Sequence, residues 1–361
     1  MFQRPDPLAV LSDKLAKRSL TRYFAAMQNQ LPAKFLIAKK TPAAFRISDS
    51  TERLWKIHAA VMEEFNRIQT EIDGGRRALQ AMETPAKSWL DLKIEIANRI
   101  MSSCHLCSHS CNVNRLEGET GYCGCGSEIV VSSIFEHVGE EPELVPSGTI
   151  FTLGCTMRCK HCQNWTISQW SEEGRVYRTV DLAHAVQQLR LNGCRNANLV
   201  GGEPTPWIPQ WLETFKHVET SVPVIWNSNS YYSPETAALL AGFADVYLLD
   251  FKYGPGRCAI EISDVQDYWE TCARNHLEAK RCGELIVRIL VLPNHLDCCT
   301  KPTVDWISQK LGPETRVNLM FQYRPEWKAF MVPELNRRLT SNEMQKAIRL
   351  AKEANLSNFI T

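Results

Sequence analysis

Short apolar runs alternate with helix-like stretches in the C-terminal part of the chain, and this alternation constrains the fold more than any other feature. The apolar runs occupy residues 149–153, 197–200, 222–226, 245–250, 285–292 and 316–321. Strands that alternate with crossover helices form parallel sheets. Runs that are apolar throughout indicate strands buried on both faces. The pattern therefore predicts an α/β fold with six parallel strands, barrel forms included.

Polar residues follow these predicted strands directly. They are Cys155, Gly201–Glu203, Asn227–Asn229, Asp250–Lys252, Asn294 and Gln322. The carboxyl ends of parallel strands meet at one edge of a sheet or barrel, and that edge hosts the active site in such folds. We expect the functional site there.

Residues 1–100 have a different texture and are predicted to be mainly helical. Apolar residues recur at helical spacing over 50–68, and a second helix is expected over 88–101. This part carries 17 Lys and Arg against 11 Asp and Glu, whereas the whole chain has a net charge of +1. A basic segment can bind nucleic acid or an acidic partner. A solvated helical extension explains the charge equally simply, and we favour it.

The cellular compartment decides how the cysteines are interpreted. No apolar run approaches the roughly 18 residues of a membrane span, and the first residues lack the apolar core of a secretory signal. We therefore expect a cytoplasmic protein without a membrane partner. Cytoplasmic thiols stay reduced, so the fourteen cysteines are expected to be metal ligands or buried thiols rather than disulfides. Eight of them lie between Cys104 and Cys162.

Cys155, Cys159 and Cys162 form a C-x3-C-x2-C motif in the loop after the first predicted strand. Three thiolates on one short loop can hold three irons of a 4Fe–4S cluster and leave the fourth iron open for chemistry. The alternative is a zinc loop, which needs a fourth ligand; His161 is a candidate by residue type but lies between two of the cysteines.

This motif resembles the C-x3-C-x-Φ-C motif of the radical S-adenosylmethionine (radical SAM) superfamily, with His161 at the usually aromatic position. The resemblance implies a partial (β/α)6 TIM-like barrel, a 4Fe–4S cluster, and SAM bound to the open iron through its amino and carboxylate groups. Reductive cleavage of SAM would yield methionine and a 5′-deoxyadenosyl radical that abstracts hydrogen from a substrate. A flavodoxin- or ferredoxin-type protein would supply the electron. No catalytic side chain of the chain itself can be named.

Later segments extend the resemblance over roughly residues 149–330. Gly201-Gly202-Glu203 looks like the GGE motif of the superfamily, and Asp250-Phe251-Lys252 is similar to the D-x-K of pyruvate formate-lyase-activating enzyme. The residues thereby implied to contact SAM are His161, Gly201, Gly202, Glu203, Asn227, Ser228, Asn229, Asp250, Lys252 and Arg288. The chain departs from the activating enzymes at Asn227, where they have an acidic residue. It also reads Phe321-Gln322-Tyr323-Arg324-Pro325 where they have Pro-Tyr-His, and it lacks the ferredoxin-like insertion of some activases.

A second cysteine set lies upstream. Cys104, Cys107, Cys111 and Cys123 have the spacing C-x2-C-x3-C-x11-C, with Cys125 as an alternative or additional ligand. Four thiolates suit zinc or an iron–sulfur centre, and spacing alone does not choose between them. The segment resembles the leader of a poorly characterised branch of activase-like radical SAM proteins. We expect His105 and His109 to be surface residues rather than ligands.

These features predict three parts: a basic helical extension over 1–100, a Cys-rich metal-binding segment over 101–148, and the partial barrel with a C-terminal helix over 149–361.

The leading function is a radical SAM enzyme that abstracts hydrogen, including one that activates a partner protein as the glycyl-radical activases do. The alternatives are modification of a small molecule, peptide or RNA, and a non-catalytic iron–sulfur electron carrier or zinc adaptor. A nucleic-acid partner is not favoured. The six cysteines after Cys162 are expected to be ordinary thiols, with a further cluster as the alternative.

Overall fold

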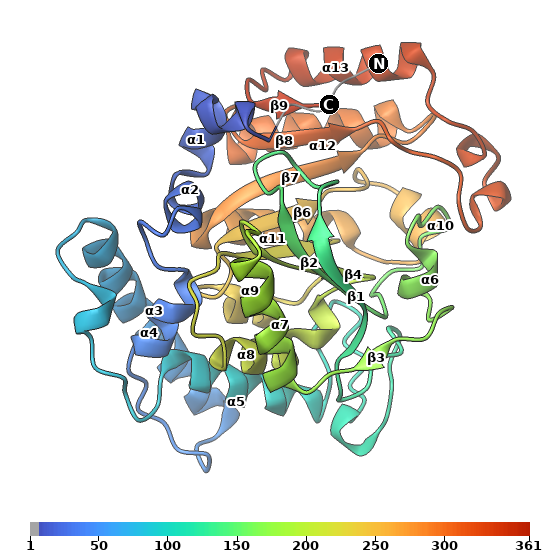
Figure 1. The fold of residues 1–361 in the computed structure, drawn as a ribbon. Coiled ribbons are helices and arrows are strands. Elements are labelled where there is room, and N and C mark those ends of the chain that lie inside the picture. The colour runs from blue at the N-terminus through green and yellow to red at the C-terminus, as the bar shows by residue number, and fades with distance from the viewer. Residues whose placement is uncertain (1–6) are drawn as a thin grey trace.

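The computed structural model describes residues 7–361. Residues 1–6, at the start that we expect to lack a secretory signal, lie outside this range. One sheet organises the fold, with strand order β3-β1-β2-β4-β5-β6-β7-β8-β9 (Figure 1). Its six central strands run parallel to one another: β2 (Ser147–Thr152), β4 (Ala197–Gly201), β5 (Val224–Ser228), β6 (Val246–Asp250), β7 (Glu284–Leu290) and β8 (Arg316–Met320).

These six strands coincide with the six predicted apolar runs to within a few residues, and the predicted α/β fold with parallel strands is confirmed. The sheet does not close into a full barrel. At one edge β2 pairs with the antiparallel strand β1 (Val130–His137), which in turn pairs with β3 (Arg175–Val176). At the other edge β8 pairs with β9 (Phe359–Ile360). The barrel is therefore partial, as expected.

Crossover helices connect the parallel strands. They are α7 (Thr179–Leu191), α8 (Ile208–Lys216), α9 (Pro234–Leu240), α11 (Tyr268–Cys282) and α12 (Lys301–Trp306), while α13 (Ser341–Glu353) precedes β9. Two short helices, α6 (Trp165–Ser168) and α10 (Cys258–Ser263), lie in loops that follow β2 and β6. The sequence did not indicate α11, because most of its exposed positions are polar or charged and its apolar stripe is narrow.

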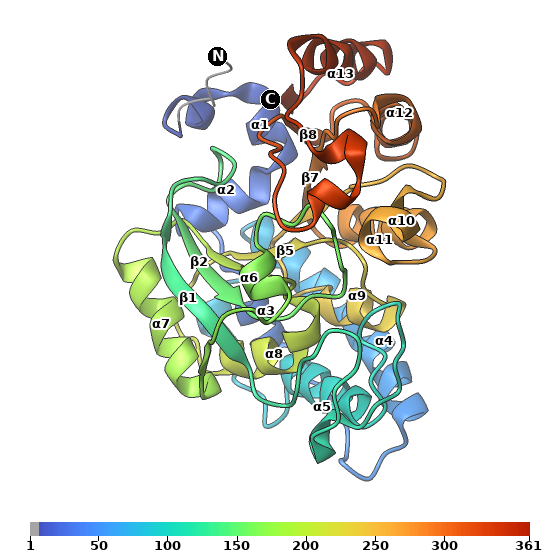
Figure 2. The ribbon, with the colours of Figure 1, turned by 90° about the vertical axis from the view of Figure 1, so that its right-hand side faces the viewer.

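The N-terminal part consists of α1 (Lys14–Ser19), α2 (Thr21–Met27), α3 (Lys34–Lys40), α4 (Thr51–Asp73) and α5 (Trp89–Met101). Figures 1 and 2 show α4 and α5 at the end of the molecule opposite α12 and α13. Trp89 of α5 is fully buried and its ring lies 4.8 Å from that of Phe65 in α4. Both belong to the same apolar core as Trp211 of α8, so these helices are built into the body of the protein.

Basic side chains of this region are largely engaged within the chain. Arg22 forms ion pairs of 3.0 Å with Asp73 and with Asp245, the residue that precedes β6. The buried Lys34 donates to the carbonyl oxygen of Cys282 at 2.6 Å. The expected solvated extension is thus a packed layer whose charges stabilise its attachment to the sheet. None of the helices in residues 7–361 combines the length and hydropathy that a bilayer span requires.

Candidate functional site

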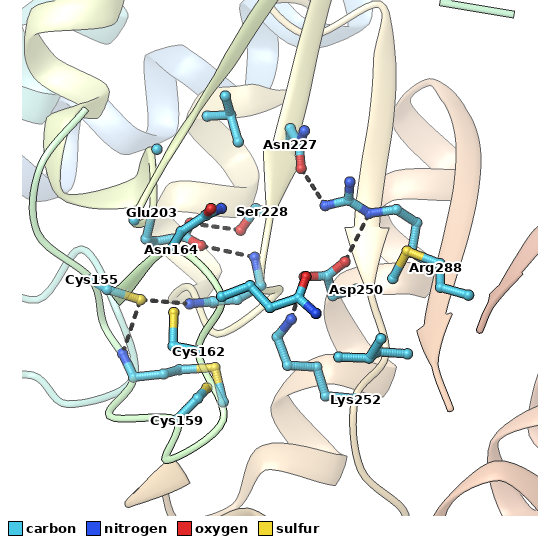
Figure 3. Close-up of a pocket in the computed structure, with 18 of the residues that line it drawn as sticks. Cys155, Cys159, Cys162, Asn164, Glu203, Asn227, Ser228, Asp250, Lys252 and Arg288 are labelled. Atoms are coloured by element: carbon cyan, nitrogen blue, oxygen red, sulfur yellow. Dashed lines mark hydrogen bonds and ion pairs between the residues drawn. The ribbon is translucent and has the colours of Figure 1, made fainter. Parts of the chain in front are cut away.

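A cavity of about 360 Å³ opens at the carboxyl ends of the parallel strands (Figure 3). Its lining brings together residues that lie far apart in the sequence. It contains every residue that the sequence assigned to the cluster and to SAM: Cys155, Cys159, His161, Cys162, Gly201, Gly202, Glu203, Asn227, Ser228, Asn229, Asp250, Lys252 and Arg288. The loop after β2 and the ends of β4, β5, β6 and β7 supply them.

The three cysteines sit on the loop between β2 and α6. Cys155 and Cys159 are buried and Cys162 is half-buried. The sulfur of Cys155 accepts from the backbone N–H of Met157 at 3.4 Å and from Nδ2 of Asn229 at 3.5 Å. Burial raises the pKa of all three thiols, that of Cys159 to about 11. A bound cation is what would favour their thiolate forms here.

The three sulfurs of this loop are not gathered as the ligands of one zinc ion are. Around one tetrahedral zinc the sulfur atoms would lie about 3.8 Å apart. Among residues 7–361, Cys155, Cys159 and Cys162 do not form a set whose sulfurs all lie within 4.8 Å of one another. Nor is His161 free to complete a zinc site through Nε2, which lies 2.9 Å from the hydroxyl of Tyr253. Burial lowers the pKa of His161 to about 3, so its ring is neutral.

Two buried polar atoms in the cavity have no hydrogen-bond partner among the described residues. They are Nδ2 of Asn227, a donor, and Oε2 of Glu141, an acceptor when ionised. Buried polar atoms are nearly always paired in native proteins. At the wall of the cavity these two are a donor and an acceptor that a polar ligand can meet, and the amino, carboxylate and ribose groups of SAM have the matching chemistry.

The two glycines after β4 permit a close approach between loops. A Cβ at Gly202 would overlap the carbonyl oxygen of Gly154 and lie 2.8 Å from the Cα of Ser168. Gly201 has a φ of +145° and lies against the backbone of Thr152, its register partner on β2. Only residues without a side chain let the end of β4 pass so near the cysteine loop.

Glu203 is 1% exposed and its carboxylate is saturated with donors. Oε1 accepts from the hydroxyl of Ser228 at 2.6 Å and from both the hydroxyl and the backbone N–H of Thr205. Oε2 accepts from the backbone N–H of Asn229 at 2.8 Å. Burial raises the pKa of Glu203, although each of these hydrogen bonds favours the charged form. Glu203 thus ties the end of β4 to the end of β5, a contact that the sequence did not show.

A charged network lines the opposite wall. Oδ1 of Asp250 accepts from Nε of Arg288 at 2.8 Å, and Oδ2 accepts from Nζ of Lys252 at 2.5 Å. Arg288 also donates to Oδ1 of Asn227 and lies 3.6 Å from Glu140. Burial alone would raise the pKa of Asp250, but Arg288 and Lys252 outweigh it and hold the pKa below its usual range. The carboxylate is therefore ionised in the cavity wall.

The structure adds lining residues that the sequence did not single out. His137, Glu140 and Glu141 come from the end of β1 and the β1–β2 connection, and Asn164 precedes α6. Gln322 lines the cavity, as its place after a strand suggested. Asn294 does not line it: its backbone N–H donates to the carboxylate of Glu343 in α13, at 2.9 Å.

The upstream cysteines lie in loops between α5 and β1. Backbone hydrogen bonds of 2.9 Å join Cys104 to Val113 and to Asn112, and these close the first turn of the segment. Burial is the largest cause that raises the pKa of Cys107. The other three cysteines of the set lie close enough to raise it further. No three of these sulfurs, within residues 7–361, lie inside 4.8 Å of one another.

This Cys-rich segment contacts the loop that carries Cys155. The buried sulfur of Cys125 lies 3.8 Å from the carbonyl oxygen of Leu153. Nε2 of His109 lies 2.8 Å from the carbonyl oxygen of Thr156, and its ring stacks on Tyr122 at 3.8 Å. The two cysteine sets are therefore neighbours. His109, expected to be a surface residue, is half-buried and joins the two loops.

Comparison with known proteins places the chain in a family. Residues 149–307 match the Radical SAM superfamily. The chain is 42% identical over 343 residues to uncharacterized protein MJ0674 of Methanocaldococcus jannaschii, covering 93% of this chain and 98% of that protein. It is 26% identical over 254 residues to uncharacterized protein MJ0808 of the same organism, covering 64% of this chain and 73% of that protein.

Among solved structures, SuiB of Streptococcus suis bound to the precursor peptide SuiA matches with a TM-score of 0.41 and 13% identity. That match covers 57% of this chain and 46% of SuiB. SuiB bound to S-adenosylmethionine matches with a TM-score of 0.38 and 16% identity, covering 57% of this chain and 48% of SuiB. The chain thus spans about half the length of these structures. The superfamily match, which begins at β2 and contains the three-cysteine loop, shows that this chain belongs to the radical SAM superfamily.

Proposed function

We propose that the chain binds a 4Fe–4S cluster through Cys155, Cys159 and Cys162, binds SAM beside it, and abstracts hydrogen from a substrate. The single observation that carries the proposal is the cavity in which three thiols of one loop meet polar groups from four strand ends. When bound, the reduced cluster supplies the electron that cleaves SAM and so generates the hydrogen-abstracting 5′-deoxyadenosyl radical.

The chain's own residues bind SAM, orient it and exclude water from the cavity. Glu203 fixes the ends of β4 and β5 relative to each other, so the polar groups around it are held before a ligand arrives. The unpartnered Nδ2 of Asn227 and Oε2 of Glu141 offer a donor and an acceptor to SAM. Asp250, Arg288 and Lys252 give the wall a charged network that is fixed before a ligand arrives.

We propose a partner protein as the substrate, with activation through a backbone radical as the activity of the same site. A second hollow, of about 500 Å³, adjoins the cavity and shares Glu141 and Gln322 with it. Its other lining residues belong to β8, β9, α13 and the segments beside them, at the open edge of the sheet. In this proposal a chain segment of a large partner enters there. The electron donor in this proposal is a flavodoxin- or ferredoxin-type protein.

Deuterium transfer tests the substrate class. Cells of the source organism are grown in deuterated medium, and their extract is divided into macromolecular and small-molecule fractions. Each fraction is incubated with anaerobically reconstituted enzyme, SAM and a reductant, and 5′-deoxyadenosine is analysed by mass spectrometry. Deuterium in the product from the protease-sensitive macromolecular fraction supports a partner protein. Deuterium only from the small-molecule fraction, or from an RNase-sensitive one, would reject it. The Cys159→Ala variant is the control.

We also propose that Cys104, Cys107, Cys111 and Cys123 hold a second metal centre, zinc or iron–sulfur. Its contacts with the cysteine loop, through Cys125 and His109, suit a centre that stabilises that loop or passes electrons to it. Iron, sulfide and zinc are quantified in anaerobically purified wild type, Cys107→Ser and the matched control Cys194→Ser. The proposal is supported if Cys107→Ser loses the metal of one centre while Cys194→Ser keeps the wild-type content. Unchanged metal content in Cys107→Ser contradicts it.

A further inference from the structure

Three further cysteines meet outside the SAM cavity. Cys258 begins α10, and Cys298 and Cys299 lie in the π-helical turn Leu296–Thr300 after β7. The sulfur of Cys298 lies 3.9 Å from that of Cys258 and 3.8 Å from that of Cys299. All three sulfurs lie within 4.8 Å of one another, and within residues 7–361 no other group of three His, Cys, Asp or Glu donor atoms does so. None of the three lines the SAM cavity.

These separations are those of ligands around one ion. A zinc–sulfur distance of about 2.3 Å with tetrahedral angles puts two sulfur ligands about 3.8 Å apart. A disulfide would bring two sulfurs to about 2.05 Å. Adjacent cysteines such as Cys298 and Cys299 chelate one ion poorly by themselves. Here Cys258, from a different loop, supplies the third thiol.

The backbone is built so that these two loops can touch. A Cβ at Gly254, in the β6–α10 loop, would overlap the carbonyl oxygen of Cys298 and lie 2.8 Å from Cγ of Pro302. A glycine at this position therefore permits the approach of the two segments. In the π-helical turn, the backbone N–H groups of Cys299 and Thr300 both donate to the carbonyl oxygen of His295, at 2.9 and 3.2 Å.

The set has three ligands rather than four. Within the described range, no fourth His, Cys, Asp or Glu donor atom shares the 4.8 Å neighbourhood. Structural zinc sites are closed by four protein ligands, whereas sites that exchange ligands keep one position open. Cys298 is exposed and Cys258 is partly so, which gives an ion a route from solvent. The site adjoins the SAM cavity through Tyr253, which precedes Gly254 in the chain. The hydroxyl of Tyr253 lies 2.9 Å from Nε2 of His161, a residue that lines the cavity.

We propose that Cys258, Cys298 and Cys299 bind one Zn²⁺ ion, with the fourth position open to water or to a thiol-bearing ligand. Soft thiolates select a thiophilic cation over Mg²⁺ or Ca²⁺. When the three thiols bind the ion, they release their protons to solvent, and neither the sulfur atoms nor the zinc change oxidation state. This centre is distinct from the SAM cluster and from the upstream cysteines.

Zinc-dependent protection from alkylation tests the assignment at the level of residues. Anaerobically purified holoprotein is treated with iodoacetamide with and without added Zn²⁺, and modification of each cysteine is quantified by peptide mass spectrometry. We expect Zn²⁺ to protect Cys258 and Cys298, the more accessible pair, while the partly exposed Cys282 reacts equally in both samples. Full modification of Cys258 and Cys298 in both samples would overturn the proposal. So would a disulfide within the set together with unchanged zinc uptake.

Metal content supplies the second measurement. Wild type, Cys258→Ser, Cys298→Ser and the control Cys282→Ser are compared for zinc and iron per chain. We expect each of the first two variants to lose one Zn²⁺ with unchanged iron, and the control to lose none. Loss of iron instead would replace the zinc assignment with a cluster. Neither measurement uses SAM cleavage, so failure of this proposal and failure of the proposed function are separate results.

Discussion

Replacement of Asp250 by Asn probes the charged wall of the cavity. The substitution keeps the shape of the side chain and removes its negative charge. Two cations then remain beside a neutral amide: Arg288, whose side chain is 16% exposed, and Lys252, also 16% exposed. Asp250 itself is 11% exposed, so solvent screens the loss only weakly.

The structure allows the magnitude to be worked out. Removing one partner from a buried ion pair costs roughly 3–5 kcal/mol, because the remaining charge, here that of Lys252, stays buried without its partner. Unfolding entropy of about 2.1 cal/mol/K per residue gives about 0.8 kcal/mol/K for 361 residues. We therefore expect Asp250→Asn to lower the melting temperature by about 4–7 °C.

Thermal unfolding of anaerobically purified protein, followed by circular dichroism, checks this value. The matched control is Glu261→Gln, which breaks the exposed pair with Arg257, whose side chains are 58% and 79% exposed. An exposed pair contributes about 0–1 kcal/mol, so the control should shift the melting temperature by about 1 °C or less. If Asp250→Asn shifts it no more than the control does, the buried network does not hold the wall together as argued.

Three further substitutions test other parts of the account. Glu203→Gln should destabilise the protein by about 1.5–3 kcal/mol, because a buried backbone N–H loses its acceptor whichever way the amide points; an unchanged urea midpoint would contradict this. Gly202→Ala should reduce the iron bound per chain, because its Cβ would overlap the backbone of Gly154 in the cysteine loop; wild-type iron content would refute the loop argument. Arg337 holds the pKa of Glu343 below its usual 4.5, so this ionised carboxylate stabilises the fold above pH 4.5 and less as the pH falls through the folded pKa. Glu343→Gln should therefore lower the melting temperature at pH 7 by a margin that shrinks below pH 4.5, and a pH-independent margin would argue against the ion pair.

The parallel strands were predictable from sequence because they are buried on both faces. β5 and β6 are buried at every position, and continuous apolar runs reveal such strands directly. β1 escaped detection because it is an edge-side strand in which Ser132, Ser133 and Glu136 interrupt the apolar residues. The cavity residues Glu140 and Glu141, which follow β1, were missed for the same reason.

The strand-end rule located most of the candidate site, since it concerns where the chain leaves a sheet and not how side chains point. It could not tell that Glu203 is saturated by hydrogen bonds within the protein, because those donors come from residues 2 to 26 positions away. Nor could it exclude Asn294, which follows β7 but lies beside α13. The meeting of Cys258 with Cys298 depends on two loops 40 residues apart, which spacing in the sequence does not encode.

Formation of 5′-deoxyadenosine is the most direct test of the central claim, that Cys155, Cys159 and Cys162 form a reactive cluster site. Anaerobically reconstituted protein is incubated with SAM and a strong reductant, and the product is measured by mass spectrometry. Wild type and the control Cys194→Ala should form it, because Cys194 lies buried beside Gly148, outside the residues that line the cavity. Cys159→Ala should form none. Equal product from Cys159→Ala and wild type, or none from wild type that carries a reducible cluster, would contradict the account.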